Sequence, residues 1–505
     1  MADTKREIER KYEGPPAGED ARLPDLTGVS GVSGVIDKGV AQLDATYYDT
    51  PDQRLAAASR TLRHRTGGDD AGWHLKLPVS EGVRDEIHAP LSDDLPQSLK
   101  GLVRSRVRDA ELVPLVRLRS TRDIRHLVDA DGALLAEVSL DRVRADRLSG
   151  GEGTAEWTEI EVELADDGDP AFLDKVEKKL RKAGLSPSTS PSKLARALAE
   201  TGGPTRHKTI AEPPATTAGD HVLAYVRTQR DAIVELDPAV RLEVEDSVHR
   251  MRVATRRMRS TFRSFGKVMD RAVTDPIADE LKWLAGELGV DRDQEVLTER
   301  LTAALDELPP PLVVGPVRDR VNTWSRARRG GSRDRLIAVL DGKRYLDLLS
   351  GLDTLLAEPP MRKAATHDPE KVLAKAVEKD LKKVSALVEQ ALDLPPGTDR
   401  DHAMHEARKK AKRTRYAAEA AAPALGKPAE SLVKSMKSLQ SLLGEHQDSV
   451  MGRDTLREVA EQAHATGESS FTYGVLYGRE EQRAAAVEAQ LPEEWEAVEG
   501  KAAAV

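Results

Sequence analysis

Three charged residues near the start of the chain alternate in a way that indicates metal and phosphate chemistry. Glu7, Glu9 and Lys11 occupy every second position, so in an extended strand their side chains share one face. Neighbouring carboxylates suit hard divalent cations, which prefer oxygen ligands, and an adjacent lysine suits a phosphate that those cations also contact. The spacing therefore predicts a strand face that holds metal ions and phosphate together.

Other alternating runs carry the same residue types. They contain the pairs Arg63 and Arg65, Arg84 and Glu86, and Glu137 and Asp141, the single Lys76, and the row Glu159, Glu161 and Glu163. One such row is ordinarily a solvated sheet face. Here, however, the alternate positions hold few of the Thr and Ser residues common on wet strands. Turned inward, these rows would line a closed barrel in which metal ions and an anionic substrate balance the charges.

The elements that must position these residues form a strand-rich segment of about 200 residues. Period-two patterns predict strands at 7–11, 61–65, 73–77, 136–141 and 158–164, and a helix follows at about 170–183. The segment 201–218 has three Pro, two Gly and no periodicity, which predicts a linker. We expect an α+β chain of two domains, the first spanning 1–200.

Several motifs, in order, resemble the CYTH domain of the triphosphate tunnel metalloenzymes. They are Glu7-x-Glu9-x-Lys11, Tyr47-Tyr48-Asp49-Thr50-Pro51, Arg63 with Arg65, Trp73-x-Leu75-Lys76-Leu77, Glu159-x-Glu161-x-Glu163, and Lys193. The resemblance covers about 1–200. It implies an eight-stranded antiparallel β tunnel barrel with flanking helices.

The resemblance also implies roles for individual residues. Mg²⁺ or Mn²⁺ would be held by Glu7, Glu9, Glu159 and Glu161, together with Glu137 or Asp141. Phosphates would be bound by Lys11, Arg63, Arg65, Lys76, Lys193 and one arginine of the stretch 117–125, either Arg122 or, second, Arg119. Glu7, Glu9, Lys11 and Lys76 form the expected catalytic set. The implied reaction is metal-dependent hydrolysis of inorganic triphosphate. Family members also act on thiamine triphosphate, on RNA 5′ ends, or as adenylate cyclases.

The second half of the chain is helical in pattern and contains an internal repeat. His249, Arg252, Arg256 and Arg259 follow helical spacing, and His405, Arg408, Lys412 and Arg415 repeat it 156 positions later. Leu288-Gly289 recurs in the same way as Leu443-Gly444. We expect a duplicated all-α bundle over 219–490, with repeats at about 219–350 and 365–490. Two basic rows placed side by side repel each other unless a polyanion lies between them, which favours linear polyphosphate as the ligand.

This half resembles the CHAD domain, the conserved-histidine α-helical domain that often follows CYTH. The motifs are Val248–Arg257 and Leu443-Gly444-Glu445-His446-Gln447-Asp448. The resemblance implies polyphosphate binding by His249, Arg252, Arg256, Arg259, His405, Arg408, Lys409, Lys412, Arg415 and His446. In the first repeat Asp291 stands at the position of His446. The histidines could instead be metal ligands, but the absence of carboxylates from their helix face favours donation to phosphate.

Composition limits the remaining function classes. The 505 residues include no cysteine, which excludes disulfides and thiolate metal sites, and aromatic residues make up only 3%, which argues against base stacking. The charged start and the lack of a long apolar run predict neither signal peptide nor membrane span. We expect a cytoplasmic protein, able to associate with polyphosphate granules, with a flexible tail at 491–505.

Two other functions remain open from the sequence. One is a non-catalytic protein that binds polyphosphate or targets granules. The other is nucleic-acid binding through the basic helices, against which the net charge of −9 counts. The oligomeric state stays open.

Overall fold

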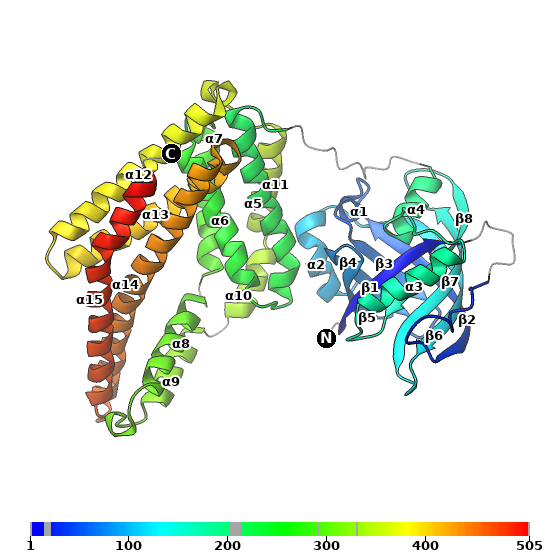
Figure 1. Cartoon of the computed structure of the whole chain (residues 1–505), viewed down its shortest axis with the longest axis horizontal. Coiled ribbons are helices and arrows are strands. Elements are labelled where there is room, and N and C mark those ends of the chain that lie inside the picture. Colours follow the sequence, from blue (N-terminus) through cyan, green and yellow to red (C-terminus); the bar gives the residue numbers. More distant parts are fainter. Residues whose placement is uncertain (1–2, 15–21, 203–213, 290–291, 330–331, 503–505) are drawn as a thin grey trace. The chain divides into compact units, whose positions relative to one another are not determined.

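The structure, a computed structural model, describes residues 3–14, 22–202, 214–289, 292–329 and 332–502. The chain divides into two compact units, Met1–Ala211 and Glu212–Val505 (Figure 1). The division falls inside the predicted linker 201–218, of which residues 203–213 lie outside the described part.

Eight antiparallel strands of the first unit close into a barrel, as predicted. Their order around the barrel is β1-β5-β4-β3-β2-β6-β7-β8. The strands are β1 (Asp3–Glu13), β2 (Gly34–Asp49), β3 (Thr61–Thr66), β4 (Gly72–Ser80), β5 (Val83–Pro90), β6 (Val113–Val128), β7 (Leu134–Arg147) and β8 (Thr154–Leu164). Five of them contain the runs predicted as strands. For β2, β5 and β6 no strand bounds were predicted, although Arg84 and Glu86 of β5 were expected to share a strand face.

Many charged side chains of the barrel strands face the interior, and much of the apolar surface of the strands faces outward. On β1, Glu7 and Glu9 face the interior, whereas Tyr12 points outward and packs with residues of α3 (Ala171–Lys182). Leu75 of β4 likewise packs outside, against α2 (Gln97–Val107). Strand alternation turns successive side chains to opposite sides of the barrel wall, and the helices remove outer apolar side chains from water.

A third helix closes one end of the barrel. α4 (Lys193–Glu200) packs Leu194 and Leu198 against inward-facing apolar residues such as Leu118 and Trp157. A short helix, α1 (Arg54–Ala57), completes the unit. The interior thus has an apolar end covered by α4 and a charged remainder, and Lys193 stands at the first position of α4.

The second unit is entirely helical in the part of the chain described here, as predicted. Its helices are α5 (Ala218–Arg241), α6 (Ser247–Ser264), α7 (Arg271–Glu287), α8 (Arg292–Asp306), α9 (Val317–Arg329), α10 (Ser332–Asp341), α11 (Lys343–Ala357), α12 (Pro369–Asp393), α13 (Thr398–Leu425), α14 (Lys427–Ala465) and α15 (Phe471–Ala502). Two 3₁₀ turns lie at Pro310–Leu312 and Lys363–Thr366. None of the described helices combines the length and apolarity needed to cross a bilayer.

The sequence repeat corresponds to two sets of three consecutive helices, α5-α6-α7 and α12-α13-α14. In each, the middle helix carries the basic row and packs against both neighbours. The two middle helices also contact each other: Arg257 of α6 lies 3.0 Å from Glu419 of α13, and Arg413 of α13 donates to the Arg263 carbonyl at 3.1 Å. The basic rows of the two repeats are therefore adjacent.

The end of the chain differs from the flexible tail that we expected for 491–505. α15 continues to Ala502, and Leu491, Trp495 and Val498 are buried against the main helical core. With Val487 they recur every three or four residues, which is the spacing of an apolar helix face. The prediction was wrong because it weighed the Glu and Ala content above this spacing.

Candidate functional site

The charged part of the barrel encloses a cavity of about 470 Å³. Among the described residues, eight basic and eight acidic side chains line it, so the two kinds are equal in number. Its basic residues are Lys5, Lys11, Arg63, Arg65, Lys76, Arg84, Arg122 and Lys193, and its acidic residues are Glu7, Glu9, Asp70, Glu86, Glu137, Glu161, Glu163 and Asp166. A purely anionic ligand would pair with the basic lining residues and leave the acidic ones without a partner, and a purely cationic ligand would do the reverse.

Three buried carboxylates and one lysine form the densest part of the site. Lys193 Nζ lies 2.9, 2.7 and 2.6 Å from carboxylate oxygens of Asp141, Glu159 and Glu161. Ser192 caps α4 by accepting from the Ala195 amide, which fixes the start of the helix and hence Lys193. Burial lowers the pKa of Lys193, but the three carboxylates outweigh burial and raise it above its ordinary value.

Arg122 bridges this centre from β6. It donates to Asp141 and to Glu161, each at 2.7 Å. Burial raises the pKa of Asp141, but Arg122 and Lys193 more than offset it and hold that pKa below its ordinary value. Pairing with these two cations therefore keeps Asp141 ionised although it is buried.

The β1 residues join the same network. Lys11 contacts Glu161 and lies 3.3 Å from Glu9, and Lys76 of β4 lies against Glu7. Burial raises the pKa of Glu7 to about 8, with Lys76 opposing this shift. The predicted row Glu7, Glu9 and Lys11 is thus brought together with Lys76.

Glu86 occupies a central position that sequence reasoning had not assigned. Arg63 donates to it at 3.1 Å, Lys76 lies 3.7 Å away, and His74 Nδ1 lies 3.0 Å away. Burial raises the pKa of Glu86, but these neighbours outweigh burial and lower it strongly. The spacing of Arg84 and Glu86 showed that they share a face, but it could not show that β5 pairs with both β1 and β4.

Arg65 completes the phosphate-binding candidates in the cavity. Its guanidinium is buried and pairs with Asp70. Burial, reinforced by Arg63, lowers the pKa of Arg65 to about 9. Arg63 and Arg65 carry like charges next to each other, so an anion bound between them would stabilise both.

Two predicted residues are placed differently. Arg119 lies outside the cavity, 49% exposed and paired with Asp146, because it is three residues from Arg122 and a strand alternates with period two. The second choice for the phosphate-binding arginine was therefore wrong. Glu137 lines the cavity, but its side chain is 34% exposed and pairs with His126, whereas Asp141 is fully buried beside Glu159 and Glu161.

The acidic centre has the donor chemistry of a metal site. Ligand oxygens of Asp141, Glu159 and Glu161 all lie within 4.8 Å of one another. Carboxylate oxygens are the ligands that Mg²⁺ and Mn²⁺ prefer. The residues therefore fit a divalent cation, which would compete with Lys193 for the same oxygens.

In the helical unit, four basic residues from the two repeats form a group that we call the basic cluster: Arg252, Arg256, Arg408 and Lys412. Burial, reinforced by the three arginines, lowers the pKa of Lys412 to about 7. Arg259 also has a lowered pKa, through burial and its neighbours Arg263 and Arg256. Like charges are thus held close together in this part of the unit.

A glycine makes room for one arginine of the cluster in each repeat. A Cβ on Gly289 would lie 2.7 Å from the Arg252 guanidinium, and one on Gly444 would lie 3.2 Å from that of Arg408. The repeated Leu-Gly pair therefore has a physical role. It lets a backbone pass directly over an arginine of its own repeat.

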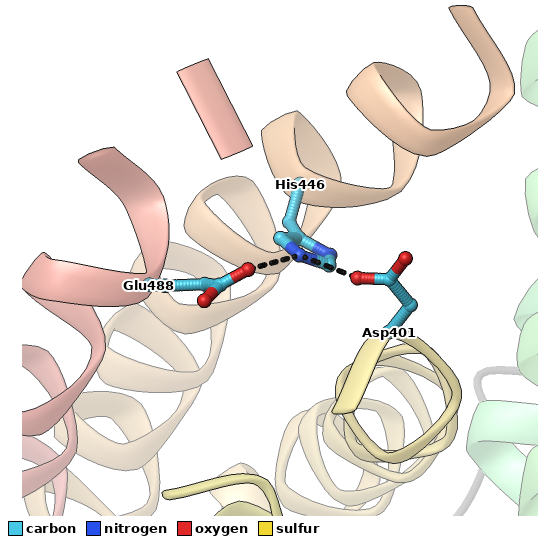
Figure 2. A group of neighbouring side chains, drawn as sticks. All are labelled: Asp401, His446 and Glu488. Carbon is cyan, nitrogen blue, oxygen red and sulfur yellow. Dashed lines mark hydrogen bonds and ion pairs between the residues drawn. The ribbon is translucent and has the colours of Figure 1, made fainter. Parts of the chain in front are cut away.

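Several residues of the predicted polyphosphate set lie outside the basic cluster. His446 is 1% exposed and stands between Asp401 and Glu488 (Figure 2), a setting that disfavours a phosphate ligand. Lys409 is 57% exposed and pairs with Glu406, and Arg415 pairs with Glu419. His405 bonds Gln447, and His249 is partly buried at the start of its row. Asp291 lies outside the described residues.

Comparisons with known proteins agree with this organisation. Residues 5–198 match the model of the CYTH domain, and residues 224–457 match that of the CHAD domain. An uncharacterized protein of Mycobacterium tuberculosis is 38% identical over 491 residues, which cover 94% of this chain and 92% of that protein.

Two further matches concern one domain each. Human thiamine-triphosphatase is 40% identical over 83 residues, 16% of this chain and 31% of that enzyme. The crystal structure of the CHAD domain from Ricinus communis is 21% identical, covers 60% of this chain and 97% of its own, and has a TM-score of 0.44. With both family matches and the near full-length relative, the chain belongs to the proteins that join an N-terminal CYTH domain to a C-terminal CHAD domain.

Proposed function

We propose that the CYTH domain hydrolyses inorganic triphosphate to pyrophosphate and phosphate with Mg²⁺ or Mn²⁺, and that the CHAD domain binds long-chain polyphosphate. The observation that carries the first part is the balanced interior of the barrel, where acidic and basic rows neutralise each other. A polyanion that enters with divalent cations offers a partner to both rows. A neutral ligand offers a partner to neither.

The residues divide into two roles. Glu7, Glu9, Asp141, Glu159 and Glu161 would hold the metal ions, with Glu86 close by. Lys11, Arg63, Arg65, Lys76, Arg122 and Lys193 would bind phosphate oxygens, and so stabilise the charge that moves onto the leaving pyrophosphate. A bound divalent cation would polarise the phosphate and lower the pKa of a bound water. The water oxygen bonds to a terminal phosphorus as the bridging P–O bond of that phosphorus breaks. Pyrophosphate leaves with the electron pair of that bond, and the water proton passes to solvent.

The cavity lining supports inorganic triphosphate over organic triphosphates. The ring-bearing side chains of the described lining are Tyr47, His74 and His88, and Arg63 contacts Tyr47. Trp73 packs outside with Tyr48, so it offers no ring to stack a base or a thiazole. Thiamine triphosphate is the second candidate, on the partial similarity to thiamine-triphosphatase.

Phosphate release by the purified full-length protein tests the CYTH proposal. Inorganic triphosphate, thiamine triphosphate and ATP are compared with Mg²⁺, with Mn²⁺ and with a chelator. We expect the highest kcat/KM for inorganic triphosphate, dependence on metal, and loss of release in the Glu7→Gln/Glu9→Gln variant. No release from any of the three would leave a non-catalytic binding protein, and release with chelator would contradict metal dependence. A higher kcat/KM for thiamine triphosphate would make thiamine triphosphate the substrate in place of inorganic triphosphate.

The CHAD proposal rests on the basic cluster, whose like charges lower the pKa of Lys412. A flexible polyphosphate chain can contact successive cations without any base being read. A cytoplasmic protein with this domain would associate with polyphosphate granules. Competition between long-chain polyphosphate and duplex DNA at fixed salt tests the choice, since equal affinity for DNA would favour general polyanion or nucleic-acid binding.

A further inference from the structure

A histidine and two carboxylates from three helices of the CHAD domain meet at one point. His446 lies on α14, Asp401 in the first turns of α13 and Glu488 on α15, and Figure 2 shows the imidazole between the two carboxylates. Nε2 of His446 lies 3.3 Å from Asp401 Oδ1 and 3.4 Å from Glu488 Oε1. The three residues can each offer one ligand atom such that all three atoms lie within 4.8 Å of one another.

Each carboxylate is held by an arginine through its other oxygen. Arg453 donates to Asp401 Oδ2 at 3.1 Å, and Arg400 donates to Glu488 Oε2 at 2.8 Å. Because these oxygens are engaged, Oδ1 and Oε1 are left directed at His446. Metal sites commonly have such outer partners, which orient the ligating carboxylates.

The spacing of the three atoms suits a transition-metal ion. An ion with bonds of about 2.0–2.1 Å holds neighbouring ligand atoms about 3.3–3.4 Å apart when its coordination is tetrahedral. The two nitrogen-to-oxygen distances have these values. One imidazole nitrogen with two carboxylate oxygens suits Zn²⁺ better than Mg²⁺ or Ca²⁺, which prefer oxygen ligands alone.

We propose that Asp401, His446 and Glu488 bind a divalent transition-metal ion, with Zn²⁺ preferred, as a centre that joins α13, α14 and α15. The centre adjoins the basic row of α13, since Asp401 and His405 are one helical turn apart. His405 in turn bonds Gln447, the residue that follows His446. The ion would therefore fix two helices at one end of that row. This inference is independent of the triphosphatase proposal.

The zinc content of the full-length protein tests the proposal. The protein is stripped with chelator and then dialysed against micromolar Zn²⁺ with millimolar Mg²⁺, which would compete for the carboxylate site proposed in the CYTH domain. We expect wild type to bind one zinc per chain more than His446→Gln and Asp401→Asn do. Glu480→Gln is the matched control, because Glu480 is a buried α15 carboxylate that pairs with Arg300 instead. It should keep the zinc.

A second measurement separates ligand loss from misfolding. Zn²⁺ should raise the Tm of the helical unit in wild type and Glu480→Gln, and leave that of Glu488→Gln unchanged, while all variants keep wild-type helical circular dichroism in the absence of zinc. If His446→Gln fails to fold, the zinc content and the zinc-dependent Tm of Asp401→Asn and Glu488→Gln test the proposal instead. The same zinc content in wild type and in these variants would overturn the proposal. It would leave an ordinary side-chain network with the His446 imidazole between two carboxylates.

Discussion

Lys412 is where the crowding of like charge in the CHAD domain can be measured most directly. Burial and the neighbouring Arg408, Arg256 and Arg252 lower its pKa from 10.5 to about 7. In the unfolded chain the lysine would keep its ordinary pKa and stay protonated at pH 7. Without a polyanion, the folded state therefore binds the Lys412 proton more weakly than the unfolded state does. Protonated Lys412 thus lowers the unfolding free energy of the helical unit at neutral pH.

Lys412→Met removes the charge and keeps most of the side-chain volume. The pKa difference corresponds to at most about 5 kcal/mol, at about 1.4 kcal/mol per unit, and structural relaxation reduces what is measured. We expect the unfolding free energy of the helical unit to rise by roughly 2 kcal/mol at pH 7, and its Tm by roughly 5 °C. The destabilisation by Lys412 is complete below pH 7, declines as pH rises, and vanishes above pH 10.5. The stability that Lys412→Met gains over wild type should therefore be smaller at pH 9 than at pH 7.

Scanning calorimetry of the full-length protein without polyphosphate is the assay. Lys437→Met is the control, because Lys437 is exposed on α14 and its removal changes the net charge equally. The affinity of Lys412→Met for polyphosphate should fall, and that of wild type should rise as pH falls through 7. A variant that is less stable than wild type, or no more stable than Lys437→Met, would refute the reasoning that the cluster is electrostatically strained.

Three further predictions concern the two domains. Charge reversal at Arg252 and Arg408 should reduce polyphosphate binding at least about 100-fold and leave triphosphate hydrolysis unchanged; joint loss would show that the domains do not act independently. Gly444→Ala should weaken polyphosphate binding roughly 10-fold because its Cβ displaces Arg408, whereas Gly286→Ala, with nothing within 4 Å of its Cβ, should bind normally. Fragment 1–205 should melt cooperatively, and aggregation would argue against the boundary.

Alternation predicted which side chains of a barrel strand share a face, but it could not predict which strands lie next to each other. Glu7 with Glu9 and Arg63 with Arg65 share faces through period two alone. The same rule requires Arg119 and Arg122 to face opposite ways, so sequence reasoning could have rejected one of them. Pairing of β5 with β1 and β4, which brings Glu86 to the centre, depends on long-range topology that spacing does not encode.

In the helical half, repetition identified the basic rows but not every partner. His446 was grouped with these rows because of its motif, and its true neighbours come from α13 and α15, which are distant in sequence. Helical spacing describes one helix at a time, so it cannot show which acids another helix brings. The buried end of α15, by contrast, could have been predicted from the sequence, because Val487, Leu491, Trp495 and Val498 have the spacing of an apolar helix face.

The central claim is that charges gathered inside the barrel bind the substrate, and a comparison of two arginines of β6 tests it most directly. Arg122 reaches Asp141 and Glu161 inside, whereas Arg119 pairs with Asp146 outside. We expect Arg122→Gln to lower kcat/KM for inorganic triphosphate at least about 100-fold, and Arg119→Gln to change it less than about twofold. Both variants should keep wild-type circular dichroism. Equal effects, or a larger effect at Arg119, would contradict the account.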